Sequence, residues 1–433
     1  MVVQATLMLF GSFFVMLFAG VPISAGIGIA SIITAIMSGM DGNIFALTAA
    51  QRCFSGCDSF SLLALPFFSL GGNVMNKGGI AKRLVRLARL LVGWVPGYLA
   101  ATNVLANMFF GAVSGSSVAA TSAMGSIMSP LELDEGYDPN YSAAVNICSA
   151  PTGILIPPSG PLILYSITAG GVSVAALFMG GYLTGALLGI AVAGLAIFLA
   201  MKKGYKASAV KEENPAWKIV LEAVPSLLAV IIVMGGILAG IFTATEAGVV
   251  MCLYCTFLAI IYREMSIKTF YDLLADTMKS SATILFLIAA SSIMSYVMSY
   301  SGIPAAISEG LMSVSNNRYM IILIMNVFLL VMGMFLDLTP AVLIFAPIFL
   351  PVVKSFGMHP IHFGIMMIMN LGIGNITPPV GSALFSGCSV AGIDMEDMIK
   401  PILPFYGAIF AALMLVAYVP WFSMVIPTLV GAV

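Results

Sequence analysis

Two eight-residue phrases in this chain carry glycine and proline at the same spacing. The first is Gly153-Ile-Leu-Ile-Pro-Pro-Ser-Gly160, and the second, Gly374-Asn-Ile-Thr-Pro-Pro-Val-Gly381, follows 221 residues later. Each lies in an apolar run, and a prolyl pair removes two backbone donors, so each phrase should break a helix inside the membrane. Unwound backbone at that depth is tolerated only beside protein or a watery cavity. At a hairpin tip beside such a break, carbonyls without partners suit a partly dehydrated cation, and free N–H groups suit a carboxylate.

Two further stretches place a polar tip between apolar arms. Residues 93–130 turn at Ser114-Gly-Ser-Ser117, and residues 319–353 turn at Asp337-Leu-Thr-Pro340. The arms are nearly long enough to cross a membrane, so their length does not decide between a re-entrant and a full hairpin. The small hydroxyl-bearing residues and the carboxylate at the tips favour re-entrant hairpins that meet near the middle of the bilayer.

Placing each tip beside its broken helix would build two cages. Ser114–Ser117 would join Gly153–Pro158, and Asp337–Thr339 would join Gly374–Val380. Sodium is the natural occupant of such neutral, carbonyl-rich cages, whereas proton coupling usually needs several titratable groups in the membrane. Asp337 could also cap the second arm, a role that is compatible with cation binding.

The composition indicates a polytopic membrane protein. Hydrophobic residues make up 61% and charged residues 8% of the 433 residues, and apolar runs recur along the whole chain. The six cysteines have the character of small core residues, since no Cys or His set completes a zinc or redox site. His359 and His362 are predicted to lie in a loop, without a metal.

The order of the apolar runs predicts two inverted repeats. Five runs fall in residues 1–201 and five in 219–433, on either side of a polar linker at 202–218; the fourth run of each set, 142–168 and 363–390, is the broken helix. With the amino terminus outside, all but Arg52, Arg318 and Lys354 of the 17 basic residues face the cytoplasm. Five crossings per half reverse the second half and put both termini in the periplasm. Matching motifs in opposite orientation are typical of secondary transporters.

Smaller features complete the prediction. Residues 76–91 carry Ile80, Leu84, Leu87 and Leu91 at helical spacing against basic positions, which indicates an amphipathic helix at the cytoplasmic interface. Residues 303–318 occupy the matching place outside. Thr243-Ala-Thr-Glu246 is predicted to be a turn with a capping carboxylate.

The chain resembles the large membrane subunit of tripartite ATP-independent periplasmic (TRAP) transporters. The resemblance lies in Gly111-Ala-Val-Ser-Gly-Ser-Ser117, Pro151–Ser159, Gly240-Ile-Phe-Thr-Ala-Thr-Glu246, Asn375-Ile-Thr-Pro-Pro379 and Pro66–Ile80, and runs nearly end to end. Ala244 stands where the family commonly has proline. The resemblance implies an elevator transporter of the ion-transporter superfamily in the bacterial inner membrane. It also implies a separate small four-helix membrane subunit and a periplasmic protein that delivers an organic acid, of the sialic acid or C4-dicarboxylate type.

The same resemblance implies the binding residues. The family's first sodium site falls on Ser114, Ser116, Gly153, Ile156 and Pro158, and the second on Thr339, Gly374, Thr377 and Val380, with Asp337 adjacent. Substrate contacts are predicted at Ser117, Asn146 and Ser159 because they lie near the first cage. Sodium is the expected coupling ion, and neither another cofactor nor nucleic acid is expected.

Two alternatives remain open at this point. One is a stand-alone sodium–dicarboxylate symporter of the same superfamily, which would need no binding protein. The other is an intramembrane hydrolase that uses Ser114, although a serine nucleophile needs a base nearby. ATP hydrolysis is not expected because the sequence has no phosphate-binding G-x-x-x-x-G-K-[ST] loop, and we predict a transporter rather than an enzyme.

Overall fold

The computed structural model describes residues 2–207, 215–315 and 317–432, and every regular element in those residues is helical. This confirms the predicted all-α class. The predicted 202–218 linker lies partly outside the described residues. The helices of the first half are α1 (Val2–Phe18), α2 (Ile23–Met37), α3 (Gly42–Cys57), η1 (Phe60–Leu63), α4 (Ala64–Lys77), α5 (Ile80–Val92), α6 (Tyr98–Ser114), α7 (Ser117–Asp134), α8 (Pro139–Ser149), α9 (Thr152–Leu155), α10 (Gly160–Thr168) and α11 (Val174–Lys202). Those of the second half are α12 (Ala216–Leu238), α13 (Ala244–Ile261), α14 (Ile267–Tyr300), α15 (Ile303–Val314), α16 (Arg318–Phe335), α17 (Leu338–Ser355), α18 (Pro360–Gly374), α19 (Ser382–Ala391), α20 (Met395–Tyr418) and α21 (Trp421–Leu429).

Many of these helices are long and apolar enough to cross a membrane. Among the described residues seven qualify individually, and the number rises to nine if each of two bent pairs counts as one span. One bent pair is α8–α9 with α10, where the chain turns by 47°. The structure thus supports a multi-pass membrane protein. The inverted relation of the two halves and their domain boundaries remain predictions.

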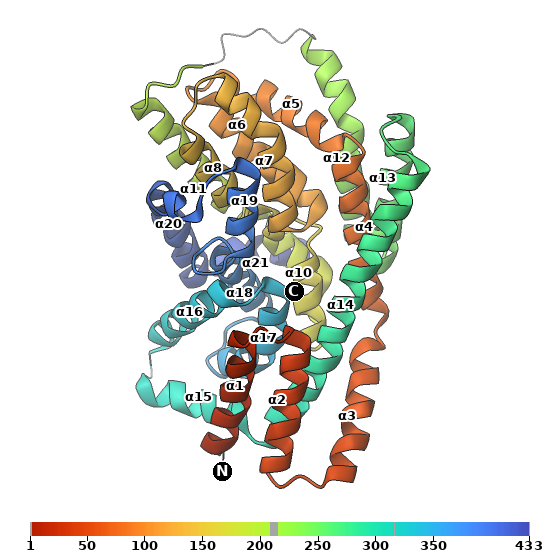
Figure 1. Cartoon of the computed structure of the whole chain (residues 1–433), viewed down its shortest axis with the longest axis vertical. Coiled ribbons are helices and arrows are strands. Elements are labelled where there is room, and N and C mark those ends of the chain that lie inside the picture. The colour runs from red at the N-terminus through yellow and green to blue at the C-terminus, as the bar shows by residue number, and fades with distance from the viewer. Residues whose placement is uncertain (1, 208–214, 316, 433) are drawn as a thin grey trace.

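Two groups of packed helices can be distinguished in the structure (Figure 1). The hairpins α6/α7 and α16/α17 lie with the interrupted helices α8–α10 and α18/α19, and we call this group the hairpin body. The helices α2, α3, α4, α12, α13 and α14 form a second group, in which α4 packs on α13 and the long α14 runs beside α3 and α2. We call this second group the frame.

Several predicted boundaries are wrong. Helix α3 was not expected, since Gln51, Arg52 and Asp58 interrupt its apolar character, yet it forms a bent pair with η1 and α4 at 55°. Helix α14 begins well before the predicted residue 281. The last predicted run is divided after Tyr418, where Pro420 precedes a new helix.

The prediction for one histidine is also wrong. His359 caps α18, but His362 lies inside that helix, is buried, and its Nδ1 is 2.7 Å from Ser423 Oγ. The helix begins at Pro360, directly after His359, so His362 and the apolar residues that follow it belong to the same helix. In contrast, the turn at Thr243–Glu246 is confirmed as a capping box.

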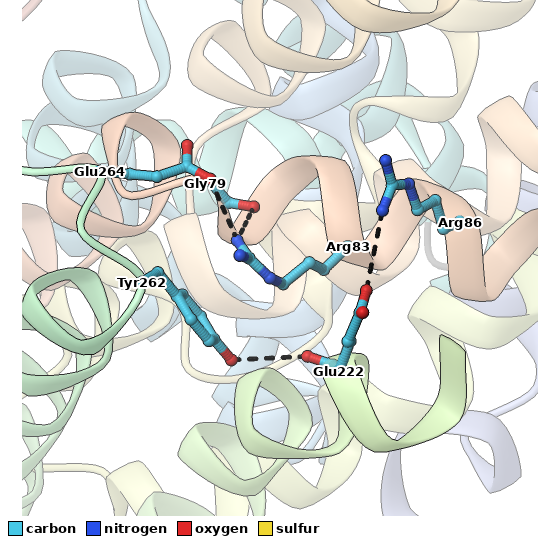
Figure 2. Close-up of polar contacts among 6 residues, drawn as sticks. All are labelled: Gly79, Arg83, Arg86, Glu222, Tyr262 and Glu264. Atoms are coloured by element: carbon cyan, nitrogen blue, oxygen red, sulfur yellow. Dashed lines mark hydrogen bonds and ion pairs between the residues drawn. The ribbon is translucent and has the colours of Figure 1, made fainter. Parts of the chain in front are cut away.

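The amphipathic helix predicted over 76–91 is confirmed as α5, which a polar cluster fastens to the frame (Figure 2). The guanidinium of Arg83 lies 3.6 Å from the centroid of the Tyr262 ring, donates to Gly79 O at 2.9 Å and approaches Glu264 at 3.5 Å. Arg86 pairs with Glu222 at 3.7 Å, and no other ion pair found among the described residues includes it. The first arginine therefore has several partners where the second has one exposed ion pair.

This difference predicts unequal losses of stability. Arg83→Ala should lower the free energy of unfolding by about 1–2 kcal/mol, because a stacked, half-buried guanidinium loses all its contacts. Arg86→Ala, the matched control on the same helix, should cost less than about 0.5 kcal/mol. The apparent midpoint of thermal unfolding in detergent measures both. Equal shifts for the two variants would contradict the assigned role of Arg83.

Candidate functional site

The first hairpin turns within two residues. Helix α6 ends at Ser114, Gly115 adopts φ +60°, and Ser116 caps α7 by accepting a hydrogen bond from Ala119 N at 3.3 Å. A Cβ added at Gly115 would lie 3.1 Å from Pro158 O. The tip therefore touches the first Pro-Pro segment directly, and only glycine both allows this φ and leaves the space.

Glycine pairs hold each hairpin against its interrupted helix. A Cβ built on Gly111 would lie 2.1 Å from the Cα of Gly153, and one built on Gly374 would lie 2.6 Å from the Cα of Gly333. The backbones thus pack without side chains between them. Each pair joins the first arm of a hairpin to the helix that carries the Pro-Pro phrase, as the cage hypothesis requires.

The second tip presents a carboxylate. Asp337 occupies the N-cap position of α17, but its side chain makes no capping hydrogen bond. Instead its Oδ1 accepts a hydrogen bond from Ser382 Oγ at 3.1 Å, and Val380 N donates to Met334 O at 3.3 Å. The predicted capping hydrogen bond is therefore absent from this side chain, and Ser382 at the start of α19 orients Asp337 instead.

A chain of polar side chains joins the two tips. Asn375 donates from Nδ2 to Ser117 Oγ at 3.2 Å, and its Oδ1 accepts from Ser382 Oγ at 2.5 Å. Ser382 also reaches Asp337, yet a hydroxyl carries a single hydrogen and donates to one acceptor at a time. This arrangement couples the hydroxyl tip of the first hairpin to the carboxylate tip of the second.

Buried asparagines support both hairpins from behind. Asn107 Nδ2 on α6 donates to Asn146 Oδ1 at 3.0 Å and to Ser149 Oγ at 2.8 Å, and Asn370 Nδ2 on α18 donates to Asn326 Oδ1 at 2.7 Å. Such side-chain hydrogen bonds between helices hold the arms in place where little water is present. They add a second connection beside each glycine pair.

The tips open into one cavity with a volume of about 540 Å³, which we call the central cavity. Its walls come from the tips, from both interrupted helices, and from α4 and α14 of the frame. Among the described residues that line it, Asp337 is the only charged one. Its polar lining residues are Ser69, Asn73, Ser114, Ser116, Ser117, Ser280, Asp337, Thr339, Asn375 and Ser382. A cavity of this size, with a few convergent polar groups, suits a small organic ligand.

Residues 10–422 match the family described as "Tripartite ATP-independent periplasmic transporter, DctM component". The chain belongs to the TRAP transporter large-subunit family. This membership makes it one component of a tripartite transporter and decides against the stand-alone symporter. The family consists of transporter permeases, so the hydrolase reading also falls.

Relatives of this chain match it over nearly its whole length. A Salmonella typhimurium protein named YgiK is 45% identical over 98% of this chain and 97% of its own length. Two Vibrio cholerae proteins are named as large permeases: one of a sialic acid TRAP transporter, 32% identical over 96% of both chains, and one of a C4-dicarboxylate TRAP transporter, 37% identical over 96% of this chain and 95% of its own.

A solved structure supports the fold. The YdaH transporter of Alcanivorax borkumensis superimposes with a TM-score of 0.62, covers 88% of both chains and is 16% identical. At that identity the likeness shows a shared fold alone.

The structure brings some of the predicted residues of this TRAP subunit to the central cavity. Ser114, Ser116, Ser117, Pro158, Asp337 and Thr339 line it. The described residues that line it do not include Gly153, Ile156, Gly374, Thr377 or Val380, and the Thr377 hydroxyl donates to Ile373 O at 2.7 Å. Their assignment to sodium remains a prediction.

Two of the predicted substrate residues, Asn146 and Ser159, are not among the described residues that line the central cavity. Asn146 Nδ2 donates to Thr121 O at 2.9 Å, and Ser159, which is fully buried, caps α10 and donates to Ile154 O at 2.5 Å. Both side chains therefore have structural partners in this conformation. Ser117 remains the predicted substrate residue that lines the space.

Sequence reasoning missed the residues that join the two halves of the site. Asn375 lies inside the second Pro-Pro phrase where the first has Ile154, and this polar difference between the phrases is the signal that could have singled it out. Ser382 and the frame residue Asn73, which donates to Thr277 Oγ1 at 3.0 Å, have no comparable signal. Only the packing of separate helices brings them to the cavity.

Proposed function

We propose that this TRAP subunit is the membrane carrier of a sodium-coupled secondary transporter that imports an organic acid. A periplasmic binding protein would deliver the acid, and a separate small four-helix membrane subunit would complete the complex. Names of relatives support an acidic substrate of the sialic acid or C4-dicarboxylate type. The subunit would lie in the bacterial inner membrane with both termini in the periplasm.

The observation that carries this proposal is the convergence of both hairpin tips and both interrupted helices on one central cavity. Hydroxyl oxygens and backbone carbonyls at each tip are suitable ligands for a hard cation. Asp337 adds the negative charge that strengthens binding at the second tip. Sodium bound there would order the tips and place positive charge beside the carboxylate of the acid, so each ligand would favour the other.

The presence of two helix groups supports an elevator movement as part of this proposal. The central cavity touches α14 at Ser280 and Ile284, near the middle of that helix and directly after Lys279, which is predicted to face the cytoplasm. Because basic residues favour the cytoplasm, this supports an inward-facing conformation. In the outward-facing state the hairpin body would have moved along α14 toward Tyr300.

Reconstitution tests the proposal. The chain, the small subunit and the binding protein are placed together in liposomes, and uptake of N-acetylneuraminate and succinate is followed with and without an inward sodium gradient. We expect uptake of an acid only with all three proteins and only with sodium outside. Uptake by the chain alone, or uptake driven equally well by a proton gradient without sodium, would contradict the proposal.

A further inference from the structure

A second cavity lies between the frame and the hairpin body, and Leu164 is the one described residue that lines both it and the central cavity. Its volume is about 360 Å³, and we call it the Arg52 cavity. Helices α3 and α14 form one wall, and residues of α10 and α17 form the other. The frame wall is polar, with Arg52, Ser55, Ser59, Ser291, Ser292, Ser295 and Ser299, whereas the facing wall includes Leu164, Ile167, Leu343 and Pro347.

The polar wall includes a hydroxyl that has no partner. Ser291 is 6% exposed, and its Oγ makes no hydrogen bond within the described parts of the chain. Serines in membrane helices usually donate to the carbonyl four residues earlier, as Ser292 does to Ile288 O at 2.9 Å. Buried polar groups are normally paired, so the unpaired Ser291 hydroxyl indicates that something else completes this wall.

Arg52 supplies the charge. It is the only charged residue among the described residues that line this cavity, and none of the ion pairs found in the described ranges includes it. Its guanidinium lies 5.7 Å from the centroid of the Tyr296 ring on α14. A guanidinium presents paired N–H donors that match a carboxylate, and no carboxylate of the lining occupies them.

Close packing fixes this wall in position. A Cβ on Gly56 would lie 2.1 Å from Ser292 Oγ, so α3 and α14 touch there, and they run side by side at the lower right of Figure 1. The thiol of Cys57 donates to Leu285 O at 3.4 Å. Arg52 and the α14 serines therefore stand on one rigid surface, which suits a preorganised binding site.

We propose that the Arg52 cavity is a second carboxylate-binding site, at which the organic acid is held on the outer side of the frame. The choice of the transported organic acid as the ligand, and of the outer side of the membrane, rests on the proposed function. The Arg52 guanidinium pairs with the carboxylate, and Ser291 and Ser295 donate hydroxyl hydrogen bonds. Ser295 lies 15 residues beyond Ser280, roughly 22 Å along α14 at the helical rise, so an outward-moved hairpin body would carry its tips to this wall.

Cysteine labelling tests the site without requiring transport. In a chain with Cys53 and Cys57 replaced by alanine, the other four cysteines are buried, and Ser295→Cys becomes the reporter. The thiol is reacted with carboxyethyl methanethiosulfonate, which is an anion, and with trimethylammonioethyl methanethiosulfonate, which is a cation. Each reaction rate is divided by the rate of the same reagent with a small thiol in solution, and the two normalised rates are compared as a ratio. We expect the carboxylate reagent to react about tenfold faster, because a charged cleft concentrates its counterion. A ratio near one would overturn the proposal.

Variants of Arg52 test whether this residue causes the preference for the carboxylate reagent. Arg52→Gln should bring the ratio close to one, and Arg52→Lys should keep most of it. Arg318→Gln, which removes another basic residue predicted to lie outside, should leave the ratio unchanged. Ser299→Cys serves as a second reporter if Ser295→Cys does not fold. A ratio that survives Arg52→Gln would also overturn the assignment.

The outcomes separate this inference from the proposed function. A carboxylate preference without sodium-driven uptake would retain the anion site and reject the transport proposal. Sodium-driven uptake without any preference at the reporter would do the opposite.

Discussion

Replacing Asp337 with asparagine is expected to raise the sodium concentration for half-maximal uptake at least about tenfold, a loss of about 1.4 kcal/mol in binding. Asparagine keeps an oxygen for the Ser382 hydroxyl but removes the only charge lining the central cavity in the described chain. Protein yield should change little, because the Asp337 side chain makes no capping hydrogen bond. The measurement is initial uptake by the reconstituted complex as a function of sodium.

Asp394→Asn is the matched control. Asp394 also occupies an N-cap position, that of α20, without a side-chain capping bond, and it does not line the central cavity. Its sodium dependence should equal that of the parent protein.

Ser116→Ala should weaken sodium activation at the first tip, with an added loss of about 1 kcal/mol in stability from the missing cap. Unchanged sodium activation in both Asp337→Asn and Ser116→Ala would remove the site assignment and leave the fold intact.

Alanine substitutions at the paired glycines should lower the rate of uptake, with losses that follow the closeness of each backbone contact. Gly111→Ala places a methyl group 2.1 Å from the backbone of Gly153, so the first tip must leave the Pro-Pro segment, at a cost of about 1–3 kcal/mol. Gly374→Ala meets backbone at 2.6 Å and should follow, and Gly333→Ala, at 3.2 Å, should be mildest. Uptake rates and thermal midpoints of the three variants give the order.

Gly194→Ala provides the reference for this series. Gly194 lies within the membrane helix α11, and a Cβ added there meets nothing within 4 Å. It should behave as the parent protein or be slightly more stable, since alanine is the better helix former. Equal activity of Gly111→Ala and Gly194→Ala would show that the close approach of hairpin and interrupted helix is not needed for uptake.

The sequence predicted the parts of the site that depend on local chemistry. Tandem prolines stop a helix wherever they occur, and Ser-Gly-Ser-Ser and Asp-Leu-Thr-Pro are turn sequences, so the positions of tips and breaks follow from neighbouring residues. The apolar face of α5 was likewise readable from its spacing, and Ile80 and Leu84 are buried as a result.

The remaining parts depend on packing between distant segments. The link from Ser117 through Asn375 and Ser382 joins helices more than 250 residues apart, and no local pattern encodes it. Helix α3 was missed because its exposed face carries Arg52 and Gln51, which lowered its apolar character. Asn146 was predicted to contact the substrate because of its proximity to the first cage, whereas in the fold its side chain donates a hydrogen bond to Thr121 O.

The single carboxylate of the central cavity determines how membrane voltage would act on the transport cycle. If each cage held one sodium ion and the acid were a monoanion, the loaded hairpin body would carry no net charge at the site, and the empty one would carry the negative charge of Asp337. One elementary charge moved through 100 mV corresponds to about 2.3 kcal/mol. A negative cell interior would then leave the loaded step unaffected and accelerate the outward return of the empty carrier, so that current would accompany the reset rather than the delivery of the acid.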